Sequence, residues 1–313
     1  MSEKLFDNLL MMLEGVKARI IDISRGQNTF LEKYGVVTSG NHQEVVILDD
    51  DDADLVGIQN LESMLVDWLL SDDPEWKLYC VVGTRGVGKT ALVKKIYDDP
   101  AVKKDFNHTI WFDIPRFINL KELTMSFIDL QNDSAREMIE AMDDNMLAQL
   151  VQRFFESSRY LVILDDVSDI GTWRSLKGLF PSKTRGCRVI IISRFAELCH
   201  TICVETGGDS RVCSLNPLSV DESQILFCRK AFSGSPLHPP PPSLMQITKD
   251  IVEKCNGLPM AILVVAGVLA TKGNGIEAWE LFHNSLVDKL QGSFTETEHM
   301  KRLLNLCYQD LPF

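Results

Sequence analysis

Residues 81–90 read Val81-Val82-Gly83-Thr84-Arg85-Gly86-Val87-Gly88-Lys89-Thr90. The last eight of them fit the pattern G-x-x-x-x-G-K-[ST], which is typical of a phosphate-binding P-loop. The apolar residues 78–82 predict a short buried strand, and residues 91–97 predict the first turns of a helix. The alternative is a chance match in a glycine-rich turn. Such a turn would not usually lie between a strand and a helix, so the order of strand, loop and helix favours a true P-loop.

The chemistry of a P-loop explains these residue types. Glycines let the backbone turn tightly, so that successive N–H groups point at phosphate oxygens. The helix that follows adds the positive end of its dipole. Lys89 brings a full charge to the outer phosphates, and the Thr90 hydroxyl is placed to bind Mg²⁺. We therefore expect the phosphates of a nucleotide to be bound by Gly83, Arg85, Gly86, Val87, Gly88, Lys89, Thr90 and Ala91.

Composition limits the classes of function. The chain has 313 residues, which is enough for two or three domains, and a net charge of −12 that disfavours binding to nucleic acid or to an anionic membrane surface. The N-terminus has no signal-peptide pattern. The longest apolar run, 258–270, contains a proline and a glycine and is too short for a membrane span. We expect a cytoplasmic protein that binds neither nucleic acid nor membrane.

The eight cysteines are scattered and include no C-x-x-C pair. Cys199 and Cys203 are the nearest to each other, with His200 between them. A zinc site there would need two further ligands, which the sequence does not indicate. Buried free thiols in a reducing cytosol are the better interpretation.

Hydrophobic periodicity predicts four regions. Residues 1–48 would be an amphipathic helix and a linker. Residues 49–215 begin with an acidic run and then alternate strands and helices, which predicts an α/β P-loop NTPase domain with a parallel sheet covered on both faces. Residues 216–300 predict a small all-α domain, and the final stretch, 303–313, starts another element. The strands are expected at 78–82, 109–114, 160–164, 187–192 and 211–215.

Residues 160–167 read Y-L-V-I-L-D-D-V, an apolar strand that ends in two acids. This is the form of a Walker B strand, in which Asp165 would support the metal ion and Asp166 would position a water molecule. Paired acids alone would be consistent with a solvated turn. Their place after a buried strand, downstream of a P-loop, favours the functional interpretation.

Another strand, 187–192, is followed by Arg194. Ligands of parallel sheets bind at the carboxyl ends of the strands, so Arg194 is placed to sense a γ-phosphate. An exposed arginine at a helix start is the alternative, and spacing alone does not separate the two. Adenine is favoured over guanine because the chain lacks N/T-K-x-D, and no motif for the acceptor substrate of a small-molecule kinase is present.

With these motifs in place, the sequence resembles the NB-ARC nucleotide switch of coiled-coil plant NLR disease-resistance proteins, within the signal-transduction ATPase class. The resemblance rests on seven motifs in order, and it departs from the family pattern at Arg85, Ser168 and Met260. The motifs occupy 83–90, 106–112, 161–167, 186–194, 215–232, 255–261 and 306–312.

The resemblance implies roles that spacing does not. ADP would be held between the nucleotide-binding and helical domains, with Val56 and Gly57 beside the adenine and Pro259 closing over the nucleotide. Arg194 would be the γ-phosphate sensor, and exchange of ADP for ATP would permit oligomerisation and defence signalling. The N-terminal helix resembles the end of the family's coiled-coil domain and would contact other NLR proteins or a second copy of the chain. The family's winged helix, M-H-D motif and leucine-rich repeats are not found in these residues. We therefore expect a chain truncated before them, in which 301–313 are the start of a truncated third subdomain.

Two other functions fit the motifs. One is a turnover enzyme, either an ATPase or a small-molecule kinase, whereas a switch would be at most a slow ATPase. The other is a truncated NLR-interacting protein that no longer switches between nucleotides. Nucleotide bound after purification would separate this last alternative from a switch.

Overall fold

The computed structural model describes residues 55–114, 120, 121, 124, 137, 139–156, 159–180, 186–232, 239–292 and 295–310. The predicted N-terminal helix and the acidic run over 49–54 lie outside these residues, as does most of the first of two helical stretches expected between 120 and 155. The chain divides into two units. The first contains Val66–Val82 and Ile96–Ser214, and the second contains the described parts of Gln43–Leu65, Gly83–Lys95 and Leu215–Phe313.

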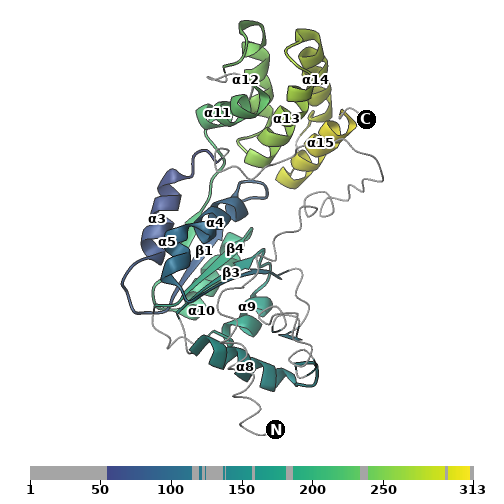
Figure 1. Cartoon of the computed structure of the whole chain (residues 1–313). Helices are drawn as coiled ribbons and strands as arrows, with labels where there is room; N and C mark the ends of the chain where they lie inside the picture. Colours follow the sequence, from purple (N-terminus) through teal and green to yellow (C-terminus); the bar gives the residue numbers. More distant parts are fainter. Residues whose placement is uncertain are drawn as a thin grey trace. The chain divides into compact units, whose positions relative to one another are not determined.

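Five parallel strands form the sheet of the first unit in the order β2-β3-β4-β1-β5. Every residue of β1 and β4 is buried, as expected for strands covered on both faces. Each predicted strand end lies within one residue of the observed one. The strands are β1 (Lys77–Val82), β2 (His108–Asp113), β3 (Tyr160–Asp165), β4 (Arg188–Ser193) and β5 (Ser210–Ser214), of which Figure 1 labels β1, β3 and β4.

Helices cover both faces of this sheet, as the sequence predicts. On one face, alternate strand residues such as Cys80, Val162 and Ile191 join a core with α8 (Asp144–Glu156), α9 (Ile170–Lys177) and α10 (Ala196–Thr206). On the other face, Trp68 of α3 (Gln59–Leu69) meets Tyr79 edge to face at 4.9 Å between ring centroids. On this face too, Tyr97 at the end of α4 (Lys89–Asp98) meets Trp111 of β2 at 5.5 Å, and Lys103 of α5 (Pro100–Asp105) lies over the Tyr97 ring.

The strand register brings three carboxyl ends to one edge. Cys80, Ile191 and Leu164 lie level across β1, β4 and β3. Beyond them, β1 continues directly into the P-loop, β3 into Asp165 and Asp166, and β4 into Arg194. Within the first unit, the fold therefore brings the acidic pair and Arg194 to the edge at which β1 ends, because parallel strands all end on the same side.

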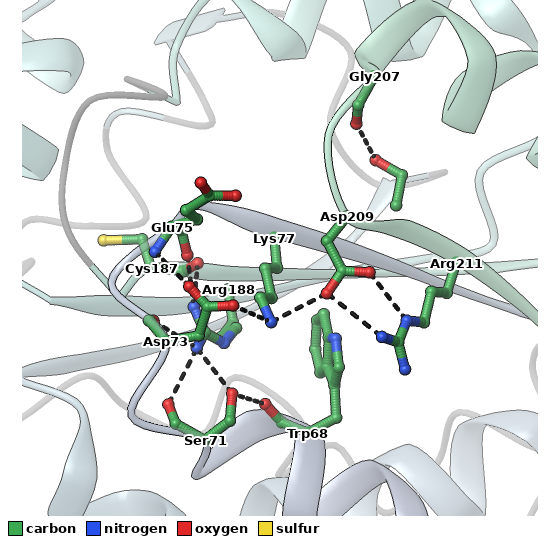
Figure 2. Close-up of polar contacts among 11 residues, drawn as sticks. Trp68, Ser71, Asp73, Glu75, Lys77, Cys187, Arg188, Gly207, Asp209 and Arg211 are labelled. Carbon is green, nitrogen blue, oxygen red and sulfur yellow. Dashed lines mark hydrogen bonds and ion pairs between the residues drawn. The ribbon is translucent and has the colours of Figure 1, made fainter.

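The opposite, amino-terminal edge of the sheet is held by a buried arginine (Figure 2). Arg188, the first residue of β4, is 0% exposed. Its terminal nitrogens donate to the main-chain oxygens of Ser71, Asp73 and Glu75 at 2.8 to 3.2 Å. The guanidinium group also lies over the Trp68 ring, 5.7 Å from its centroid. One side chain thus fixes the loop between α3 and β1 to the sheet.

Lys77, the first residue of β1, lies beside this arginine and bridges two carboxylates (Figure 2). Its ammonium group is 2.6 Å from Asp73 and 2.9 Å from Asp209, which in turn pairs with Arg211. Burial lowers the pKa of Lys77, but the hydrogen bonds to both carboxylates outweigh it and leave the pKa raised. The same contact lowers the pKa of Asp209. The ion pair between Lys77 and Asp209 therefore links the amino ends of β1 and β5.

Helices form the larger part of the second unit. Trp279 is fully buried among them, stacks on Phe232 at 5.5 Å and donates to the Gly273 carbonyl. The predicted capping box of Ser219 and Glu222 is confirmed. The helices are α11 (Val220–Ala231), η3 (Pro242–Leu244), α12 (Met245–Lys254), α13 (Pro259–Thr271), α14 (Ile276–Lys289) and α15 (Glu296–Gln309) (Figure 1).

The last helix, α15, differs from its prediction. It begins at Glu296, seven residues before residue 303, where we expected the element to start. The Thr295 side chain accepts a hydrogen bond from the Glu298 amide and caps the helix. The prediction was wrong because the first turn is polar and shows no apolar period. Within the described residues, no helix has both the length and the apolar character needed to cross a membrane.

Replacing Arg188 tests its role at the amino edge. We expect Arg188→Met to lower the free energy of unfolding by about 2–4 kcal/mol, because three main-chain carbonyls lose the charged donor that a fully buried side chain supplies. Urea unfolding followed by tryptophan fluorescence measures the change. The matched control is Arg211→Met, whose side chain is 57% exposed and should cost no more than about 0.5 kcal/mol. Equal effects of the two substitutions would contradict the assignment.

Candidate nucleotide-binding site

The P-loop runs from the end of β1 to the first residue of α4, Lys89. The Lys89 side chain is only 8% exposed. Its ammonium group donates to the carbonyl oxygens of Gly83 and Thr84, each at 2.8 Å. These two bonds fold the charge back over the loop and hold it there, away from bulk water. An ammonium group in this place is ready to meet phosphate oxygens at the same loop.

Two further features of the loop fit an anionic group. The Thr84 hydroxyl is buried and has no hydrogen-bond partner among the residues that the structure describes. An unpaired buried hydroxyl costs free energy, and a phosphate oxygen would satisfy it. The first turn of α4 carries no acidic residue, so no carboxylate there opposes an anion at the helix N-terminus.

The loop backbone touches two other segments of the second unit. A Cβ on Gly83 would lie 2.6 Å from the Leu215 carbonyl oxygen, so the main chains of the P-loop and of the segment after β5 are in close contact. The Gly86 carbonyl accepts a hydrogen bond of 3.1 Å from the amide of Met260, in the first turn of α13. Met260 follows Pro259 directly, which brings the predicted nucleotide-closing residue next to the P-loop.

The segment that was predicted to border the adenine lies against the start of α11. Val56 is half-buried, and a Cβ on Gly57 would lie 2.8 Å from a carboxylate oxygen of Glu222. The Leu218 amide, just before α11, donates to the Gly257 carbonyl at 2.8 Å. The second unit therefore brings together residues from four segments that are distant in sequence: 55–58, the P-loop, 215–222 and 255–260.

The acidic pair at the end of β3 belongs to the first unit, as does Arg194. Asp166 has a φ of +60°, a left-handed conformation that is uncommon outside glycine and is often found at functional sites. Its carboxylate lies 3.2 Å from the Nε of Arg194, whose side chain is 37% exposed. The structure thus places Arg194 before a helix, as expected for an exposed arginine at a helix start. It also pairs Arg194 with Asp166, the acid that was predicted to position water.

The predicted metal ligands have different surroundings. Thr90 is exposed in the first turn of α4, and Asp165 is half-buried at the end of β3. No group of three or more His, Cys, Asp or Glu residues in the described part of the chain could hold a metal ion by itself. A magnesium ion carried by nucleotide phosphates needs few protein ligands, so the Mg²⁺ assignment stays a prediction.

Comparison with known protein families identifies the family of this chain. The family defined as the NB-ARC domain matches residues 58–236, which is more than half of the chain. The chain belongs to the NB-ARC family. This NB-ARC match covers the P-loop, the acidic pair and Arg194, and it identifies a nucleotide-binding domain.

Curated relatives of this NB-ARC chain are plant resistance proteins. The ToMV resistance protein Tm-2(2) of Solanum lycopersicum is 29% identical over 98% of this chain and 35% of its own length. Putative disease resistance RPP13-like protein 2 of Arabidopsis thaliana is 28% identical over 97% of this chain and 35% of its own length. The chain therefore spans about a third of the length of these relatives.

Solved structures overlap the NB-ARC chain less closely. A signal transduction ATPase with numerous domains from Pyrococcus horikoshii covers 80% of this chain at 14% identity, with a TM-score of 0.43. CDC6P from Pyrobaculum aerophilum covers 87% with a TM-score of 0.39. Such values are too low to transfer a function or a binding mode.

Some residues of this NB-ARC site were not predicted. These are the Met260 amide, which bonds to the Gly86 carbonyl, and the buried Thr84 hydroxyl. The P-loop pattern allows any residue at position 84, and a main-chain amide leaves no mark in a sequence motif. Met300 of α15 also lies at the loop. A Cβ atom added to Gly86 would be 3.2 Å from the Cε of Met300. A signal for Met300 is absent from the sequence, because only the packing of α15 brings it there.

Gly257 offers a test of these close main-chain contacts. It has a φ of +68°, and a Cβ there would lie 2.4 Å from the Leu218 carbonyl oxygen. We expect Gly257→Ala to destabilise the protein by at least about 2 kcal/mol, through both backbone strain and the clash. The matched control is Gly267→Ala within α13, where no atom lies within 4 Å of a Cβ and a gain of up to about 1 kcal/mol is expected. Thermal unfolding would measure both, and a neutral Gly257→Ala would contradict the contact.

Proposed function

We propose that this NB-ARC chain is an ADP/ATP-binding molecular switch that acts in plant defence signalling. ADP occupies the resting state and is exchanged for ATP on activation, in the cytoplasm. The plant resistance proteins that match nearly the whole chain support the defence context. The observation that carries the proposal is the P-loop itself, with the Lys89 ammonium folded over it and Met260 bonded to Gly86.

The proposal gives each predicted residue a role. The loop amides and Lys89 bind phosphates, Val56 and Gly57 border the adenine, and Pro259 lies over the nucleotide. Thr90 and Asp165 hold Mg²⁺, a role that rests on the motifs. The main-chain hydrogen bonds of Leu218 to Gly257 and of Met260 to Gly86 support a nucleotide-dependent arrangement of the helices, because 215–222, 255–260 and the P-loop cannot move apart without breaking them.

Hydrolysis has a limited part in this proposal. Asp166 positions water, and Arg194 senses the γ-phosphate. Because the Asp166 carboxylate is paired with Arg194, it is less available to accept a proton from water, which suits slow turnover better than rapid catalysis. A steady-state rate above about 1 s⁻¹ would favour a turnover ATPase, and a defined acceptor would favour a small-molecule kinase. A purified protein that neither carries nor binds nucleotide would favour the NLR-interacting alternative.

The binding site is tested by removing the Lys89 charge. We expect Lys89→Ala to weaken ADP binding by about 100-fold, since a charge-assisted contact to phosphate is lost. Equilibrium dialysis with labelled ADP measures this, together with the nucleotide released from denatured wild-type protein. Lys301→Ala, on the exposed surface of α15, is the charge-matched control. If Lys89→Ala binds ADP as tightly as the control does, the site is wrongly assigned.

The sensor role of Arg194 predicts a difference between two nucleotides. We expect Arg194→Ala to weaken ATP binding by about 10-fold and to leave ADP binding within about twofold, because only ATP carries the γ-phosphate that the guanidinium contacts. The same dialysis with each labelled nucleotide gives the ratio of affinities. Arg174→Ala, an exposed pair with Glu205 in the same unit, is the control. A parallel loss for ADP and ATP would refute the sensor role.

A further inference from the structure

Three thiols gather between β1 and α10, although they are far apart in sequence. Cys80 lies in β1, and Cys199 and Cys203 lie in α10. The four-residue spacing places both helical cysteines on one side of α10, and the core arrangement turns that side toward β1. The sulfur atoms of Cys80 and Cys203 are 3.9 Å apart. The sequence did not predict this group of three, because Cys80 is more than a hundred positions away from Cys199 and Cys203.

The three thiols differ in access to solvent. Cys80 and Cys199 are 0% exposed, whereas Cys203 is only partly buried. The hydrogen bond with Cys80 lowers the pKa of Cys203, although burial acts in the opposite direction. A thiolate rather than a thiol attacks an oxidant. Cys203 is therefore the member of the group that a small oxidant in solution would reach and that could react.

We propose that Cys80 and Cys203 form a reversible disulfide when the protein meets a peroxide. The Cys203 thiolate attacks one peroxide oxygen and becomes a sulfenic acid as the O–O bond breaks, with release of water after protonation. The Cys80 thiol then attacks the Cys203 sulfur, and a second water leaves as the S–S bond forms. Two thiols are oxidised and one peroxide is reduced.

Geometry favours this pair over the other two combinations. A disulfide needs its Cβ atoms about 3.5–4.5 Å apart, but residues four apart on a helix have Cβ atoms about 5–6 Å apart. Cys199 and Cys203 therefore do not fit a bond within α10. A bond between Cys80 and Cys199 would require oxidation to begin at a fully buried sulfur. For Cys80 and Cys203, the sulfur atoms are already 3.9 Å apart and need to approach by about 2 Å to bond.

The disulfide would connect α10 to the strand that carries the P-loop. Cys80 precedes Gly83 by three residues in a strand that is buried along its whole length. The site would thus be an oxidation site next to the nucleotide-binding loop, and its formation does not depend on which nucleotide is bound. A disulfide between Cys80 and Cys203 can therefore be tested independently of whether the chain binds ADP or ATP.

The test is differential alkylation of the native, full chain with and without hydrogen peroxide, followed by peptide mass spectrometry. We expect the peptides of Cys80 and Cys203 to lose their free thiols together and to appear as one cross-linked species that is two hydrogens lighter. A thiol reductant should restore both thiols. Far-UV circular dichroism confirms that the protein remains folded during the treatment.

Variants separate this pair from its neighbours. Cys203→Ser, at a partly exposed position, should abolish the cross-link, and Cys80→Ala should do the same. Cys199→Ser and Cys213→Ser should keep it; Cys213 is a buried cysteine of β5. A cross-link through Cys199, a disulfide between two chains, a sulfinic acid at Cys203 without a cross-link, or unchanged thiols would each overturn the proposal.

Discussion

The hydrogen bond from the Met260 amide to the Gly86 carbonyl makes the P-loop and the first turn of α13 depend on each other. Both groups belong to the main chain, so the bond does not depend on the side chain at Met260. An amide in the first turn of a helix has no partner within that helix, and the loop carbonyl satisfies it. The close approach of Gly83 to Leu215 adds a second main-chain contact. Any change in the shape of the P-loop must therefore either move α13 or leave a polar group unpaired.

Polar groups have different surroundings at the two edges of the sheet. At the amino edge, Arg188 and Lys77 are buried and bonded to several partners, which is the usual state of structural polar groups. At the carboxyl edge, Asp166 adopts a left-handed backbone conformation, and the loop that follows β1 contains the unpaired hydroxyl of Thr84. Strain and unpaired groups persist only where the surrounding fold holds them, and they tend to mark binding sites. Buried atoms without a hydrogen-bond partner among the described residues also occur at the amino edge, at the Nε of Arg188 and the Nε1 of Trp68. The left-handed Asp166, rather than the unpaired groups, is therefore what distinguishes the carboxyl edge.

The sequence predicted those features that local patterns determine. Apolar runs placed all five strands, and Ser219 with Glu222 marked the start of α11, because strand burial and helix capping depend on neighbouring residues. The start of α15 carries a similar signal in Thr295 and Glu298, which was not recognised. The partners of Arg188 could not be predicted, because they are carbonyls of a loop more than a hundred residues earlier. Cys80 and Cys203 are likewise separated by 123 positions, and only the packing of α10 on β1 brings them together.

The ion pair between Asp166 and Arg194 links two roles that the motifs describe separately. The Nε of Arg194 is engaged by the carboxylate at 3.2 Å, while the side chain remains partly exposed. A phosphate that approached this guanidinium would compete with Asp166 for the same charge, since both are anions. If Asp166 lost its partner, its carboxylate would regain acceptor capacity for a water molecule. In the roles proposed for these residues, recognition of an anion by the arginine and activation of water by the acid would therefore be coupled through this ion pair.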